Sequence, residues 1–216
     1  MKIAVLGGTG RQGKGLAMRL ALAGHEVRVG SRTLAKAESA VVEMHERLQA
    51  RATLGAADNL GAARWCELAL LTVPHPHELN TIERVSAQLE GKILVDVSVP
   101  LVSYRPAQVA LPPAGSAAEA VQRCLGEHTN VVAAFKTTSA AVLQQLDKTL
   151  PSDELVCGDD ADARAVVMRL VSDLGARALD AGALRNARAL ELWTALLIGL
   201  DQRYKKKAVG FTFNGL

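Results

Sequence analysis

Aromatic residues are scarce in this sequence. Phe, Trp and Tyr together make up 3% of the 216 residues, although 49% are hydrophobic. The core must therefore be built from Ala, Leu and Val. The length suits one large domain or two small ones.

Cysteine is also rare. Cys66, Cys124 and Cys157 form an odd, widely spaced set. Such a set makes neither a disulfide framework nor a zinc-binding pattern, which favours a reducing compartment. We therefore expect a cytoplasmic protein.

Long apolar runs are missing as well. No stretch approaches the roughly 20 residues that a membrane span needs, and residues 1–6 are too short for the apolar region of a signal peptide. The net charge is +3, with both signs scattered along the chain, which gives no nucleic-acid signature. We expect neither a membrane nor a nucleic acid as partner. The basic run 203–207 is interpreted as a solvated helix end rather than a polyanion site.

The N-terminal stretch carries the strongest pattern. Residues 2–6 are a short apolar run typical of a buried parallel strand, and G-x-G-x-x-G follows at Gly8, Gly10 and Gly13, before a helical pattern that stops at Gly24. We expect Gly8 to permit the turn, Gly10 to let a pyrophosphate lie against bare backbone, and Gly13 to let helix and strand pack closely. The phosphates would then lie over the free N–H groups at the helix start. The pattern predicts a dinucleotide-binding loop.

The residues after the second expected strand favour NADP(H) over NAD(H). An NAD enzyme usually places Asp or Glu about 20 residues past the glycines, to bind the ribose 2′-hydroxyl. This sequence has Ser31 and Arg32 there, with Lys36 one turn further on. A hydroxyl, a guanidinium and an ammonium would hold a 2′-phosphate, which a carboxylate would repel.

The remaining chain alternates expected strands and helices, which indicates an α/β, Rossmann-like, doubly wound and mostly parallel sheet of about eight strands with a C-terminal helix. We expect one NAD(P)-binding domain over 1–216, with a dinucleotide-binding half over 1–100 and an acceptor-site half with the C-terminal helix over 101–216. The strands after the first are expected over 25–30, 52–55 (weak), 68–73, 92–97, 130–135, 155–157 and 177–180. The expected helices run from a Thr33 cap to about Arg51, from a capping box at Ser116 to about Leu125, from a cap at Asp159 or Asp160, and from Ala183 to about Lys205.

Loops after the strands are expected to line the ligand crevice. Thr72, Val73 and Pro74 follow a buried strand, so we expect them to edge the cofactor. His75 and His77 lie beside prolines, but no carboxylate or thiolate nearby completes a metal-ligand set, so we expect no metal site. Residues 101–115 are expected to form an irregular loop of the length often found over an active site.

Four groups of residues resemble one family, the NADPH-dependent reductases of the deazaflavin coenzyme F420. The matching segments are Gly7–Ala17, Gly30–Arg32 with Lys36, Val156–Asp160 and Leu179–Leu184. The resemblance covers nearly the whole chain. It implies that Thr9 to Gln12 (Thr9, Gly10, Arg11, Gln12) hold the pyrophosphate, that Ser31, Arg32 and Lys36 hold the 2′-phosphate, and that Val73, Val99 and Ala140 line the nicotinamide end. It also implies a homodimer and a direct hydride transfer between two facing rings, for which a protein supplies positioning and a dry site.

Lys136 departs from the family pattern, which often has His after the strand at 130–135. A lysine there is a candidate catalytic residue, since it could stabilise negative charge on a reduced acceptor ring. It could equally mark a subgroup with another acceptor, such as a flavin or a quinone, or be a surface lysine at a strand end.

Two other functions stay open. A reductase of an imine or keto acid shares this N-terminal half, but such enzymes usually append a long helical domain. An NADP-sensing regulator without turnover would bind the same cofactor, but this chain shows no appended interaction domain.

Overall fold

Eight strands form one sheet in the computed structural model, which describes residues 1–216. Their order is β10-β9-β8-β5-β4-β1-β2-β3, and all neighbours are parallel except the antiparallel pair β8 and β9. The strands are β1 (Lys2–Leu6), β2 (Glu26–Ser31), β3 (Gly55–Asp58), β4 (Leu68–Leu71), β5 (Ile93–Asp96), β8 (Asn130–Ala133), β9 (Glu154–Gly158) and β10 (Ala178–Asp180). The expected Rossmann-like, mostly parallel sheet is confirmed.

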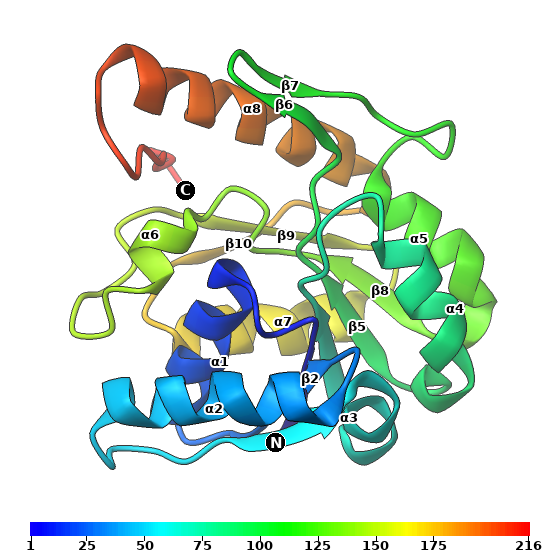
Figure 1. Ribbon diagram of the computed structural model, residues 1–216. Helices are drawn as coiled ribbons and strands as arrows, with labels where there is room; N and C mark the ends of the chain where they lie inside the picture. Colours follow the sequence, from blue (N-terminus) through cyan, green and yellow to red (C-terminus); the bar gives the residue numbers. More distant parts are fainter.

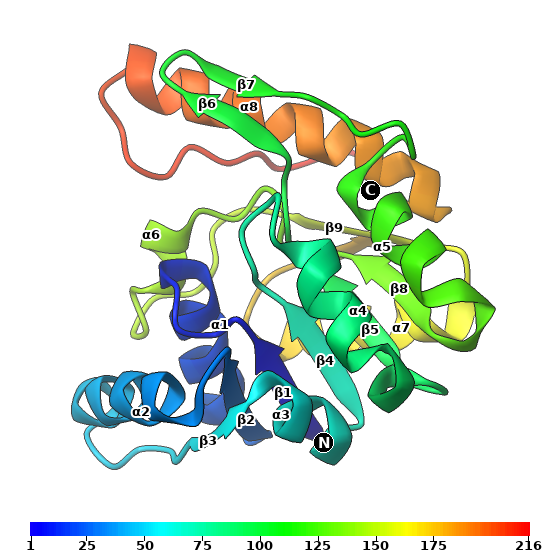
Figure 2. The same ribbon diagram turned by 45° about the vertical axis from the view of Figure 1, so that its right-hand side comes forward.

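Helices cover both faces of this sheet (Figures 1 and 2). Successive residues of β1 point to opposite faces, so Ile3 and Val5 join one core while Ala4 and Leu6 join the other. The first core contains residues of α1 (Arg11–Leu22), α2 (Leu34–Leu48) and α7 (Ala161–Asp173). The second contains residues of α3 (Asn59–Trp65), α4 (Glu78–Leu89), α5 (Ala117–Leu125) and α8 (Ala187–Arg203). Short helical turns complete the chain at α6 (Ala140–Leu143), η1 (Gly126–His128) and η2 (Leu184–Asn186).

A hairpin replaces the irregular loop expected at 101–115. Strands β6 (Leu101–Tyr104) and β7 (Ala107–Val109) pair antiparallel and lie along α8 (Figures 1 and 2). The Gln202 side chain near the end of α8 donates to the Tyr104 carbonyl and ties the two together. The loop expectation was wrong because the alternating pattern of a short, half-exposed hairpin is hard to see between prolines.

Three smaller expectations also differ from the structure. Helix α2 ends at Leu48 rather than near Arg51, because Gln49 and Ala50 have φ of 49° and 62°. The third strand is Gly55–Asp58 rather than 52–55. Thr33 stands at the N-cap of α2 without a side-chain cap hydrogen bond.

The helical period of the sequence after Thr33 places Ala37, Ala40, Val41, Met44 and Leu48 on one face, and these are the buried residues of α2. None of the helices in the structure is both long and apolar enough to cross a membrane.

Candidate functional site

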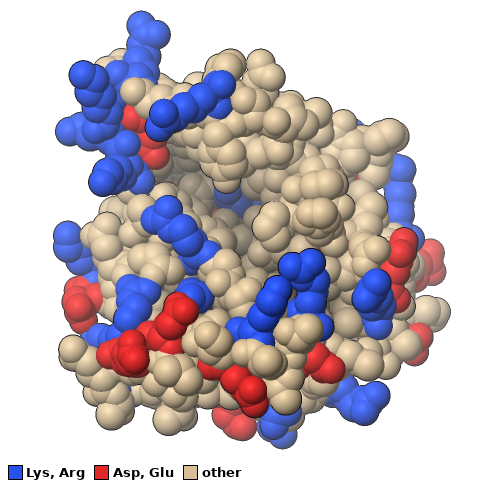
Figure 3. Space-filling model, in the orientation of Figure 1, with Lys and Arg blue, Asp and Glu red and all other residues tan.

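Four parallel strands end side by side at one edge of the sheet. The register aligns Leu6 with Leu71, Leu71 with Asp96, and Asp96 with Ala133. The strand order reverses between β1 and β4, which is where open α/β sheets bind ligands. Figure 3 shows the face hollowed between this edge and the layer formed by α8, the hairpin and the C-terminal tail. We take this hollow as the candidate site.

The glycine loop lies at this edge, and each glycine there has a separate physical reason. Gly7, rather than the expected Gly8, makes the turn, with φ of +71°. A Cβ on Gly8 would lie 2.8 Å from the Val5 carbonyl oxygen, and one on Gly13 would lie 2.6 Å from the Gly8 Cα. These distances leave no room for a side chain, so both glycines serve the close packing of loop, strand and helix.

Gly10 is different, because its absent side chain would meet no protein atom within 4 Å. Its φ of −77° and ψ of 169° suit any residue. Helix α1 begins at the next residue with no side-chain cap hydrogen bond and no acidic residue in its first turn. The bare backbone and the helix N-terminus thus fit an incoming pyrophosphate.

Gln12 uses its side chain within the protein. Its Nε2 donates to the carbonyl oxygens of Phe135 and Thr138, both at 3.1 Å. The Arg11 carbonyl in turn accepts a hydrogen bond of 2.7 Å from Gln144. These bonds join the glycine loop to the exit of β8 and so fix the position of one relative to the other.

A cavity of about 510 Å³ opens beside the end of β2. Ser31 and Arg32 line it on one side, and Thr81 and Arg84 of α4 line it together with His77, which directly precedes that helix. Neither arginine forms an ion pair. Two unpaired guanidinium groups in one cavity fit a phosphate well.

Sequence reasoning missed Arg84. Its only signal was the spacing of His77, Thr81 and Arg84, which places three polar residues on one helical face. Lys36, by contrast, is exposed on α2 and does not line the cavity.

One carboxylate, that of Asp58, also lines this cavity. It lies opposite Ser31 in the register of β2 and β3, and its Oδ1 accepts the Gly61 N–H at 2.6 Å. Asp58 therefore caps α3, and the helix N-terminus offsets part of its negative charge. The donors of the cavity still fit a 2′-phosphate.

The residues expected to line the nicotinamide end differ in how deeply they are buried. The Thr72 hydroxyl donates to the Leu6 carbonyl at 2.9 Å, so it serves the end of β1. Val73 is buried under Gly7, while Val99 and Ala140 are half-buried and Pro74 is exposed. Their roles toward a cofactor stay predictions.

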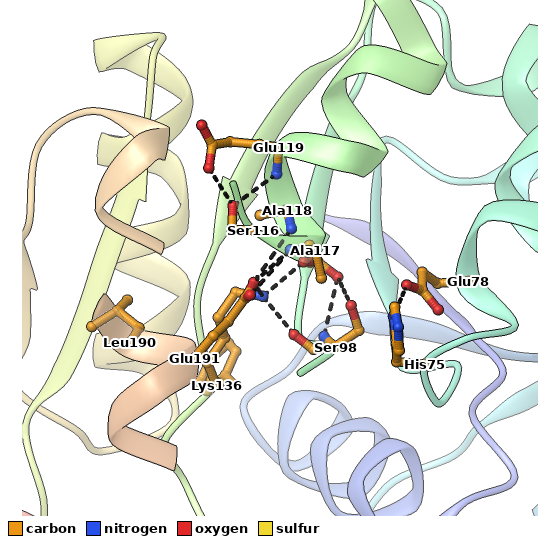
Figure 4. Close-up of polar contacts among 12 residues, drawn as sticks. His75, Glu78, Ser98, Ser116, Ala117, Ala118, Glu119, Lys136, Leu190 and Glu191 are labelled. Atoms are coloured by element: carbon orange, nitrogen blue, oxygen red, sulfur yellow. Dashed lines mark hydrogen bonds and ion pairs between the residues drawn. The ribbon is translucent and has the colours of Figure 1, made fainter. Parts of the chain in front are cut away.

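Lys136 lies inside the protein in an ion cluster with Asp96 and Glu191 (Figure 4). Its Nζ donates to Asp96 Oδ2 at 2.7 Å, to the Ser98 carbonyl at 2.6 Å and to Glu191 Oε1 at 3.0 Å. The three charged side chains have no exposed surface. The interpretation as a surface lysine is therefore wrong. Since all three ammonium protons are used, the structure also gives the lysine no proton to direct at an acceptor ring.

Glu191 connects this cluster to two further elements. It stands on α8, and its carboxylate accepts the N–H groups of Ala117 and Ala118 at the start of α5 (Figure 4). Burial raises the pKa of Glu191 while Lys136 opposes that rise. Burial alone would lower the pKa of Lys136, but the two carboxylates outweigh it and the pKa lies above its ordinary value. The cluster thus joins the end of β5 and the segment after β8 to α5 and α8.

A second buried acid, Glu154, lies at the exit of β8. Because β9 runs antiparallel to β8, its first residue comes close to Phe135, whose N–H it accepts at 2.6 Å. Thr138 donates its hydroxyl to the same carboxyl group. Burial raises the pKa of Glu154 to about 7, against these two hydrogen bonds.

The two histidines after Pro74 do not share a ligand. His75 pairs with the buried Glu78 (Figure 4), whose Oε2 has no partner. His77 instead lines the cavity beside Ser31. No three His, Cys, Asp or Glu side chains are grouped as a metal site would require.

Known proteins match this chain over its whole length. It is 42% identical to the F420-dependent NADP reductase of Methanocaldococcus jannaschii, over 100% of this chain and 99% of that protein. It is 41% identical to the enzyme of the same name from Methanothermobacter marburgensis, again over 100% and 99%. The family model described as NADP oxidoreductase, coenzyme F420-dependent, matches residues 2–100.

This chain belongs to the F420-dependent NADP reductase family. A crystal structure from Arthrobacter sp. FB24, whose description proposes an F420-dependent NADP reductase, has a TM-score of 0.85 and 28% identity, with 99% of each chain covered. The resemblance expected from the sequence is confirmed.

Two of the family segments have structural roles in the fold. Val156–Asp160 and Leu179–Leu184 contact each other: the Gly158 N–H donates to the Gly182 carbonyl at 2.9 Å, and the Leu184 N–H to Asp159 Oδ1 at 2.9 Å. Within the first segment Cys157 pairs with Ala133, the last residue of β8, and Gly158 pairs with Val132, so the chain after Gly158 leads toward the amino end of β8. The other two segments, the glycine loop and Ser31–Arg32, lie at the hollow.

Proposed function

We propose that this chain transfers a hydride between NADP(H) and coenzyme F420. The observation that carries the proposal is the full-length match to F420-dependent NADP reductases, together with a glycine loop and a cation-lined cavity placed for NADP(H). The reactivity belongs to the nicotinamide and the deazaflavin, which exchange the hydride directly when both are bound.

The protein binds and orients in this proposal. The backbone at Gly10 and the start of α1 hold the pyrophosphate, and Ser31 and Arg32 hold the 2′-phosphate. The hydrogen bonds from Gln12 to the exit of β8 keep the glycine loop and the acceptor side at a fixed distance. The layer of α8 and the hairpin covers one side of the hollow, so with both ring systems bound it would limit the access of water to the hydride.

A direct assay tests the proposal. NADPH is incubated without oxygen with F420, a flavin, a quinone or an imine, and the absorbance of the nicotinamide band is followed. We expect its loss with F420 at a rate at least tenfold above the other acceptors. Equal rates with the flavin or quinone would favour the alternative acceptor, and binding without turnover would favour a sensor.

We also propose a homodimer in the cytoplasm. Helix α8 leaves Leu192 and Leu196 exposed by 48% and 59%, which gives a second copy an apolar face to cover. All three cysteines are free, as expected in a reducing compartment. Light scattering on a sizing column tests the dimer: Leu196→Glu should yield monomers, and an unchanged mass would place the interface elsewhere.

A further inference from the structure

Four cations gather where α8 ends. Arg203, Lys205, Lys206 and Lys207, here called the basic segment, are all exposed, and none forms an ion pair. The nearby Asp201 forms no ion pair with them, and its Oδ1 accepts a hydrogen bond from the Val209 N–H at 2.8 Å. The segment therefore carries four positive charges without an ion-pair partner, next to the single negative charge of Asp201.

The backbone holds the basic segment at the rim of the hollow. The Lys206 N–H donates to the Asp201 carbonyl at 2.9 Å, and the Ser139 hydroxyl donates to the Lys207 carbonyl at 3.3 Å. Ser139 directly precedes Ala140, at the end of the hollow expected to hold the nicotinamide. In Figure 3 a group of Lys and Arg side chains projects above the hollow, over the end of α8 and the tail.

The segment lies on the acceptor side of the site. The cavity for the 2′-phosphate, with Ser31, Arg32 and Arg84, opens beside β2. The exit of β8, to which Lys207 is tied, lies four strands away, past β1, β4 and β5. In the proposed arrangement NADP(H) has its own cations in that cavity, which leaves the four cations of the basic segment for an anion on the acceptor side.

We propose that the basic segment binds the acidic side chain of the deazaflavin co-substrate. This inference rests on the proposed function. Coenzyme F420 carries a phosphodiester and glutamate carboxylates on a flexible chain attached to its ring, and such a chain would leave the hollow at its rim. Long lysine side chains there provide an electrostatic contact that tolerates a variable position of the anions.

Neutralising the segment tests this role. The variant Lys205→Gln, Lys206→Gln, Lys207→Gln removes three exposed charges and no intramolecular ion pair. The matched control Arg64→Gln, Arg169→Gln, Arg185→Gln also removes three exposed cations, which stand on α3, α7 and η2 and form no ion pair. KM is measured for F420, for the ring-and-ribityl fragment without the acidic side chain, and for NADPH, at low and high salt.

We expect the lysine variant to raise KM for F420 about 3- to 30-fold at low salt, the range that three exposed charge contacts can supply, and to lose this difference near 0.5 M salt. In the lysine variant, KM for the fragment and for NADPH should stay within about twofold of the unmodified protein. In the control variant, KM for F420, for the fragment and for NADPH should all stay within that range. An unchanged KM for F420, or an equal rise for the fragment, would overturn the inference and leave the proposed function standing. If the unmodified protein turns over neither F420 nor the fragment, both the proposed function and this inference are refuted.

Discussion

Gly10 and Gly13 belong to one loop but are required for different reasons. A side chain at Gly10 would enter open space, while one at Gly13 would lie 2.6 Å from Gly8 Cα and 2.7 Å from Thr72 Oγ1. We predict that Gly10→Val abolishes NADPH binding and leaves the melting temperature nearly unchanged, whereas Gly13→Val destabilises the fold by about 1–3 kcal/mol or more. Calorimetric titration and thermal melts measure both. If Gly10→Val binds NADPH normally, the glycine loop is only a turn and does not contact the pyrophosphate.

The two arginines of the cavity should determine the choice between the dinucleotides. We predict that Arg32→Ala weakens NADPH binding by about 1.5–3 kcal/mol, the scale of a hydrogen bond to a charged group, and that Arg84→Ala weakens it in the same direction. NADH binding should barely change, because NADH has no 2′-phosphate. Arg64→Ala, on the surface of α3, is the control. An equal loss for NADPH and NADH would contradict the assignment.

The buried position of Lys136 changes what its replacement should do. Lys136→Met would leave Asp96 and Glu191 buried without a counter-charge, and we predict a loss of about 3–5 kcal/mol in the free energy of unfolding. Urea titration measures this loss. A stability equal to that of the unmodified protein would refute the prediction.

A double variant separates positioning from direct catalysis. Lys136→Met with Glu191→Gln removes one charge of each sign and should recover part of the lost stability. If kcat recovers with it, Lys136 acts by holding Ser98 and α8 in place. If kcat stays about 10- to 1,000-fold low in a stable double variant, the lysine contributes directly to the developing charge.

At the scale of elements, the antiparallel pairing of β8 and β9 creates a pH dependence. It buries Glu154 beside Phe135 and raises its pKa to about 7, compared with 4.5 ordinarily. Between these values the folded protein binds more protons than the unfolded chain, so stability falls as pH rises from about 4.5 to 7. A shift of this size corresponds to about 3 kcal/mol.

Glu154→Gln should remove this dependence. Glutamine imitates the protonated acid and keeps a partner for both Thr138 and the Phe135 N–H. We predict that the variant is more stable than the unmodified protein at pH 8 and similar to it at pH 5. Urea titrations at both pH values give the comparison, and parallel curves for the two proteins would show that Glu154 does not titrate in this range.

At the scale of the whole molecule, the proposed site predicts stabilisation by its cofactor. NADPH at one hundred times its Kd should add about 2.7 kcal/mol to the free energy of unfolding. For a chain of this length the melting temperature should then rise by about 5–10 °C. NADH at the same concentration should raise it less. Equal shifts with both dinucleotides would speak against a 2′-phosphate site.

Local spacing in the sequence determines several parts of this protein by itself. The strand, glycine loop and helix at the N-terminus follow from an apolar run, G-x-G-x-x-G and a helical period, all within about twenty residues. The buried face of α2 and the Ser116 cap of α5 follow from similarly short patterns. Neighbouring residues set these features, because helix periodicity and capping act over one or two turns.

Only the tertiary structure decided the features that depend on distant residues. Lys136 follows a strand, as expected, but its burial depends on Asp96 and Glu191, which are 40 and 55 positions away. Arg84 and Arg32 line one cavity although they are 52 positions apart, and Cys157 lies beside Ala133 because β9 runs antiparallel to β8. The direction of a strand and the partner of a buried charge depend on how the whole chain packs, since no local pattern specifies which side chain will be close across the fold.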